Sequence, residues 1–143
     1  MNSTRTSLSI FAGIAIMVCL SVATYVWATE VALTVYTSSS SGVDVTMASA
    51  NVGSGQSFTN NGKTILIVQK ESGADTSTLT IVTGATLGGF AVADRVVTLA
   101  PGDTQVIGPF DPQIFSNSSN LVTLAWEAGT TGTTVAAVSV KGY

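Results

Sequence analysis

The chain has 143 residues, of which 45% are hydrophobic and only 9% are charged, and its net charge at pH 7 is −3. This length fits one domain, and the acidic balance argues against a nucleic-acid-binding surface. Histidine is absent and there is a single cysteine, so the usual general base is missing and neither an intrachain disulfide nor a cysteine-rich zinc site is available. The composition favours a binding or structural protein over an enzyme, and we find no catalytic, cofactor-binding or metal-ligating motif.

The N-terminal segment differs from the rest of the chain because residues 8–28 contain no charged side chain. A helix of this length rises roughly 31 Å, enough to cross the hydrocarbon core of a bilayer. We therefore predict a hydrophobic helix within residues 1–28 and a separate domain over residues 29–143. The side chains expected to contact the membrane are Leu8, Ile10, Phe11, Ile14, Ile16, Val18, Leu20, Tyr25 and Trp27.

Three interpretations of this segment stay open. A retained membrane anchor fits the length of the segment and the interfacial positions of Tyr25 and Trp27, and Arg5 before the segment would place the following domain outside the cell. A cleaved secretory signal also fits, with Ala28 as the last residue before cleavage. A start codon assigned too early would remove the segment from the working protein.

Downstream of the segment, short β-branched or alternating stretches separated by turn residues predict β-strands. Residues 31–36 and 43–48 are the first two predicted strands. The turn signal at Asn61 and Gly62 leads into residues 64–68, an apolar run without a break. Such a run predicts a central strand that is covered on both faces.

The later predicted strands are residues 78–83, with Leu79 and Ile81 facing inward, and residues 95–99, 105–108, 121–126 and 134–140. No amphipathic helix is expected among them. About eight short strands predict an all-β fold, a β-sandwich or a jelly roll, preceded by one hydrophobic N-terminal helix. The large side chains expected to fill its core are Phe58, Phe90, Phe110, Phe115 and Trp126.

Three stretches resemble a family of small all-β structural proteins of tailed phages and prophages: NNGKTILIVQK (60–70), LTIVTGAT (79–86) and GGFAVADRVVTLAPGDTQVIGPFDPQIFSNSSN (88–120). The resemblance covers about residues 30–143. It implies a virion structural protein, a capsid decoration or cement subunit on the outer surface of the particle, which acts by burying surface. The implied partners are further copies of the chain, as a trimer or a lattice, and a major capsid protein; no cofactor is implied.

The resemblance also implies which positions determine the shape of the domain: Asn61, Gly62, Asp94, Arg95, Gly108, Pro109 and Phe110. Asp94 and Arg95 are expected to form either an ion pair or a plain surface pair. The hydrophobic N-terminal segment departs from the family pattern. A secreted or membrane-anchored cell-surface protein, or a pilin-like filament subunit, is therefore the alternative function.

Overall fold

The computed structural model describes residues 29–127 and 129–141. The predicted hydrophobic helix, with the membrane-contacting residues from Leu8 to Trp27 and the cleavage residue Ala28, lies outside the described residues. The described chain forms strands β1 (Val31–Ala32), β2 (Val35–Thr37), β3 (Ala48–Ser49), β4 (Gln56–Thr59), β5 (Thr64–Lys70), β6 (Ser77–Val82), β7 (Thr86–Leu87), β8 (Phe90–Ala91), β9 (Arg95–Leu99), β10 (Thr104–Ile107), β11 (Leu121–Trp126) and β12 (Thr133–Ser139), and one short helix, α1 (Pro112–Phe115).

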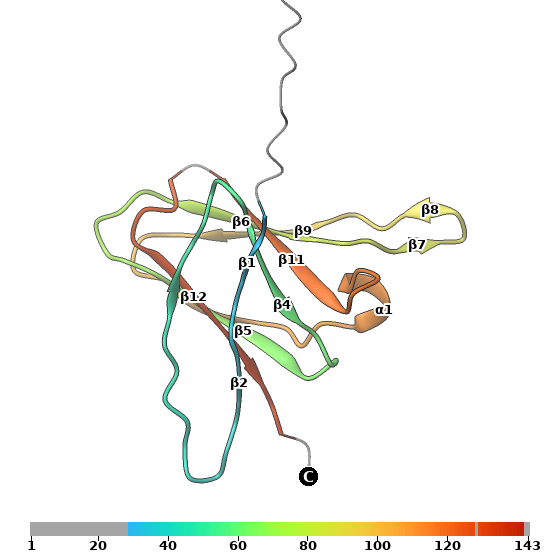
Figure 1. The fold of residues 1–143 in the computed structure, drawn as a ribbon. Coiled ribbons are helices and arrows are strands. Elements are labelled where there is room, and N and C mark those ends of the chain that lie inside the picture. Colours follow the sequence, from blue (N-terminus) through green and yellow to red (C-terminus); the bar gives the residue numbers. More distant parts are fainter. Residues whose placement is uncertain (1–28, 128, 142–143) are drawn as a thin grey trace, which may run out of the picture.

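Two mixed five-stranded sheets make up the body of the molecule (Figure 1). Sheet A has the order β1-β4-β11-β6-β9, and sheet B has the order β10-β5-β12-β2, with β3 on the same edge of β12 as β2. β1 runs parallel to β4 and β2 runs parallel to β12, whereas the other pairs are antiparallel. The all-β prediction is confirmed for the part of the chain that the structure describes.

The inner faces of the two sheets share one apolar core. Side chains along a strand point alternately to its two faces, so every second residue of each long strand enters this core. Leu79 and Ile81 of sheet A are fully buried, as predicted, against a cluster that includes Leu66 and Val68 of sheet B. From β4 to β12 the chain changes sheet at nearly every connection, and only the step from β6 to β9 stays within one sheet.

The strand predicted over residues 43–48 is wrong for most of its length, because only Ala48 and Ser49 pair, with β12. β2 already occupies the other half of that edge of β12, so the alternating residues before Ala48 have no strand edge to join. β4 was missed by the sequence pattern because two of its buried residues, Gln56 and Ser57, are polar.

The prediction that Phe90 fills the core is also wrong. Phe90 lies on the β7–β8 hairpin, which projects beyond the body of the molecule (Figure 1), and its side chain is 80% exposed. Gly88 and Gly89 both have positive φ and turn the chain back outside the sheets. Phe58, Phe110 and Trp126 are buried as predicted, and the partly buried Phe115 packs against the core.

Phe110 joins the end of β10 to helix α1 and anchors both to the core. Its ring centroid lies 5.5 Å from that of Phe58 and 5.6 Å from that of Phe115, in tilted arrangements that aromatic rings favour. The peptide bond between Gly108 and Pro109 is cis. Gly108 has a φ of +120°, and a Cβ there would lie 3.0 Å from the Phe110 ring and 3.1 Å from the carbonyl oxygen of Thr64.

We predict that Phe110→Ala destabilises the protein by about 3–5 kcal/mol, because it opens a cavity in a closed core. Phe90→Ala is the matched control, and it should change the free energy of unfolding by no more than about 0.5 kcal/mol. Urea unfolding of the full chain followed by tryptophan fluorescence measures both values. Equal costs at the two positions would contradict this view of the core.

Candidate functional site

The predicted shape-determining pair Asn61 and Gly62 forms the turn between β4 and β5. The Asn61 amide nitrogen donates to Ser139 Oγ at 2.8 Å, and its Oδ1 accepts from the Lys63 main-chain N–H at 2.9 Å. Gly62 has a φ of +79°, a region that glycine enters without a steric penalty. The turn is thereby tied to the last residue of β12.

Asn60, the residue before this turn, is buried, and its side chain bonds to three different parts of the chain. Its Nδ2 donates to the main-chain oxygen of Phe110 at 3.1 Å and to Ser116 Oγ at 3.0 Å. Its Oδ1 accepts from the N–H of Gly62 at 3.0 Å. One side chain therefore holds the β4–β5 turn and both ends of the α1 segment together.

Asp94 and Arg95 lie where the β7–β8 hairpin leaves the body. Asp94 Oδ1 accepts from the main-chain N–H of Thr83 at 2.7 Å and from Thr83 Oγ1 at 3.1 Å. The carboxylate therefore fastens the two arms of the hairpin at its base. Arg95 is exposed at the first position of β9.

A second polar cluster, which the sequence did not reveal, closes the opposite end of the core. Lys70 is only 3% exposed, and its Nζ donates to the carbonyl oxygens of Gly129 and Thr131 and to Thr133 Oγ1, at 3.0, 2.7 and 3.1 Å. Thr133 Oγ1 also lies 2.8 Å from Ser77 Oγ. Three acceptors match the three donors of a lysine head group.

A lysine beside two hydroxyls resembles the parts of a nucleophilic site. Here, however, Ser77 and Thr133 are as buried as Lys70, so the hydroxyls face the closed interior and not a substrate. The cluster links sheet B, through Lys70 and Thr133, to sheet A, through Ser77. We interpret it as a structural clamp on the β11–β12 loop.

The outer face of sheet B carries an apolar patch, which we define as Ile65, Ile67, Val106, Pro109 and Val140. Ile67 and Val106 are direct partners in the β5–β10 pair, and Ile65 lies two residues along the same face. Val106 is 65% exposed. Ile65, Pro109 and Val140 line a shallow hollow of about 310 Å³, with Gly62 and Lys63 at its rim.

The patch corrects the prediction that residues 64–68 are covered on both faces. The inner side chains of β5 are fully buried, whereas Ile65 and Ile67 on the outer face are only half-buried. The outer face of sheet A is mixed: the hydroxyl-bearing residues Thr78, Thr80, Thr98 and Thr123 lie there beside Val82 and Val96. β5 is therefore apolar on a face that no other part of the described chain fully covers.

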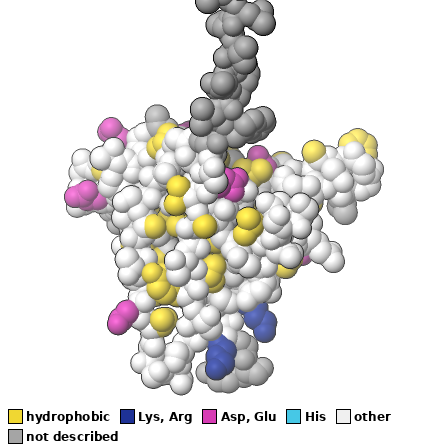
Figure 2. Space-filling view, in the orientation of Figure 1, with side chains coloured by type: hydrophobic (Ala, Val, Ile, Leu, Met, Phe, Trp, Pro, Cys, Tyr) yellow, Lys and Arg dark blue, Asp and Glu magenta, His cyan; other side chains and the backbone are white. Residues whose placement is uncertain are grey.

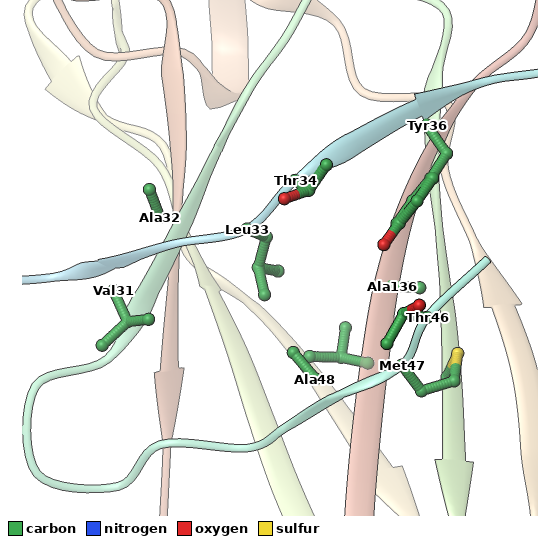
Figure 3. Close-up of a pocket in the computed structure, with 10 residues that line it drawn as sticks. Val31, Ala32, Leu33, Thr34, Tyr36, Thr46, Met47, Ala48 and Ala136 are labelled. Carbon is green, nitrogen blue, oxygen red and sulfur yellow. The ribbon is translucent and has the colours of Figure 1, made fainter.

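A separate apolar groove lies at the other edge of sheet B, between the β1–β2 segment and the residues that lead into β3 (Figure 3). It has a volume of about 200 Å³. We call it the edge groove. The residues that line it are Val31, Ala32, Leu33, Thr34, Tyr36, Thr46, Met47, Ala48, Val135 and Ala136. The groove exists because β2 and β3 pair with different halves of β12 and diverge from each other.

No family model, curated protein or solved structure matches this chain. Within residues 29–127 and 129–141, no three acidic or cysteine side chains lie close enough together to hold a metal ion. In the same residues, we find no helix with the length and hydrophobicity that a membrane crossing requires. The features that distinguish the described surface are thus the apolar patch, the edge groove and the projecting hairpin.

We predict that Thr133→Val destabilises the protein by about 1–3 kcal/mol, because it keeps the shape of the side chain but removes an acceptor from a buried charged group. The neighbouring Thr134→Val is the control. Thr134 lies on the outer face of β12, and the change should cost no more than about 0.5 kcal/mol. Chemical unfolding of both full-length variants measures the two losses in free energy of unfolding. Equal losses would show that the hydrogen bonds of the cluster do not stabilise the fold.

Proposed function

We propose that this chain is a structural subunit of a virus particle, a capsid decoration or cement protein that acts by burying surface. In this proposal the two facing sheets are a β-sandwich that serves as a rigid block. The block contacts a major capsid protein and further copies of itself. The resemblance of residues 60–120 to small phage structural proteins supports the proposal.

The observation that carries the proposal is the outer face of β5. Continuous apolar strands belong in sheets that are covered on both faces, yet Ile65 and Ile67 are only partly buried and Val106 beside them is 65% exposed. A contact that covers them removes apolar area from water and so stabilises the complex. We infer that the shell of the particle supplies this second cover.

The alternative is a secreted or membrane-anchored cell-surface or filament subunit, which the uncharged residues 8–28 favour. In a filament built on a helical core these residues would remain in the mature protein. A decoration protein could lose them and still bind the shell.

We predict that the chain co-purifies with nuclease-treated, density-purified particles, in a fixed ratio to the major shell protein. Immunoblots of the gradient and intact mass spectrometry of the recovered chain test this. Recovery only in the cell-envelope fraction would contradict the virion proposal and favour the alternative. A mass that begins at Thr29 would exclude both a retained anchor and a helical filament core.

We predict that Val106→Glu abolishes binding of the chain to particles, because it places a charge in the middle of the apolar patch. Val96→Glu is the matched control: Val96 also lies on an edge strand and is 62% exposed, but on the outer face of sheet A. Co-sedimentation with particles stripped of the native protein measures both. If only Val96→Glu abolished binding, the surface that contacts the particle would be the outer face of sheet A, which would contradict the proposal.

A further inference from the structure

The β7–β8 hairpin presents an aromatic side chain that its own molecule leaves uncovered. Phe90 is 80% exposed, more than any other large hydrophobic residue whose exposure the structure describes. The positions where Gly88 and Gly89 would carry a Cβ have no other atom within 4 Å, so the tip stands free of the body. Figure 2 shows the hydrophobic atoms at the end of this arm, apart from those on the body.

The edge groove lies on the opposite side of the molecule from the hairpin, as the order of the strands in the two sheets shows. The hairpin extends from β6 and β9, at one edge of sheet A, whereas β1 forms the other edge. β2 and β3 complete the groove at the edge of sheet B that is farthest from β10. A hairpin that continues β6 and β9 points away from this groove (Figure 1), so the two surfaces of one molecule do not meet.

The size and chemistry of the groove match a phenyl ring. An apolar cavity of roughly 150 Å³ accommodates benzene in a protein interior, and the edge groove has about 200 Å³. Val31 and Leu33 extend from the β1–β2 segment to the side on which Ala48 lies (Figure 3). None of the residues that line it is charged.

The charges around the two surfaces are also complementary. Arg95 is exposed at the base of the hairpin, and the neighbouring Asp94 is engaged by Thr83. Glu30 and Asp44 are exposed and lie one and two residues from the groove-lining Val31 and Thr46. In Figure 2 acidic side chains flank the hydrophobic cluster over this part of the body.

We propose that the edge groove receives the β7–β8 hairpin of a second copy of this chain, with Phe90 inserted between the β1–β2 segment and β3. The inference rests on the proposed structural role and names the surfaces of its self-association. The hairpin and the edge groove are different surfaces, so the contact between two copies is head-to-tail. Repeating this contact from copy to copy gives a ring or an open array and not a two-fold dimer.

One such contact is small. An aromatic side chain buries about 150–250 Å², far less than the roughly 1,200–2,000 Å² of a stable complex. Each contact is therefore weak alone, and it becomes effective where many copies are held side by side, because the local concentration is then high. Covalent trapping suits a contact of this kind better than a measurement of free dimer.

The test uses the full chain in mild detergent, with Cys19→Ser to remove the native thiol. One preparation carries Ala91→Cys, an exposed position next to Phe90, and keeps Phe90 itself; the other carries Val31→Cys in the lining of the groove. On mixing and mild oxidation we expect a disulfide-linked dimer that contains one chain of each kind. Ser118→Cys, an exposed position in the α1–β11 loop, replaces Ala91→Cys as the control and should give a severalfold lower yield.

A charge exchange sharpens the result. Arg95→Glu on the hairpin chain should lower the yield of dimer, and Glu30→Lys with Asp44→Lys on the groove chain should restore it. Dimers that form equally with the Ser118→Cys control would overturn the proposal. Dimers formed by the Ala91→Cys chain alone, without the partner, would also overturn it, because they would indicate a symmetric tip-to-tip contact.

The outcome is independent of particle association. A specific mixed dimer from a chain that never enters particles would leave the hairpin contact standing and remove the virion role. A chain bound to particles without any mixed dimer would do the reverse.

Discussion

In a two-layer β protein each strand can bury only one of its two faces in the core. This constraint determines which side chains hold the sheets together and which remain on the surface. The chain has a single cysteine, so no intrachain disulfide holds the sheets together, and their cohesion comes from the inward side chains such as Leu66, Leu79 and Leu124, which are fully buried. The outward side chains do not take part in this core. On sheet A several of them are threonines, as expected of a face in water, with Val96 among them, whereas sheet B places Ile65, Ile67 and Val106 there.

The ends of the core are closed by polar groups that hydrogen-bond within the protein. At one end Asn60 and Asn61 hold the β4–β5 turn to the Phe110 segment and to β12. At the other end Lys70 holds the β11–β12 loop through Thr133. Buried polar atoms are costly unless they have partners, and in the described chain every buried side-chain nitrogen and oxygen has one. The loops at both ends are thereby fixed, which keeps the outer faces rigid enough to serve as contact surfaces.

Alternation and turn chemistry were enough to predict the all-β class and most of the long strands, and the inward direction of Leu79 and Ile81 came from their spacing alone. Phe90 was misplaced because hydrophobicity does not show whether a hairpin extends past its partner strands. β4 and Lys70 were missed because their burial depends on hydrogen-bond partners far along the chain, Trp126 for Gln56 and Thr133 for Lys70. The half-covered face of β5 is a separate case. The sequence pattern predicted a cover on both faces, and the described chain covers the outer face only in part.

The three distinctive surfaces lie on different parts of the fold, and this separation matters for assembly. The apolar patch is centred on β5 and β10, the edge groove on β2, β3 and the neighbouring face of β12, and the hairpin beyond β6 and β9. A copy seated on a shell through its patch would keep both the groove and the hairpin accessible to its neighbours. In this proposed arrangement, contacts between neighbours could be weak individually, because the shell would already fix their spacing and the number of contacts would supply the resistance to separation. A protein with one self-complementary face would form closed pairs and could not continue such a layer.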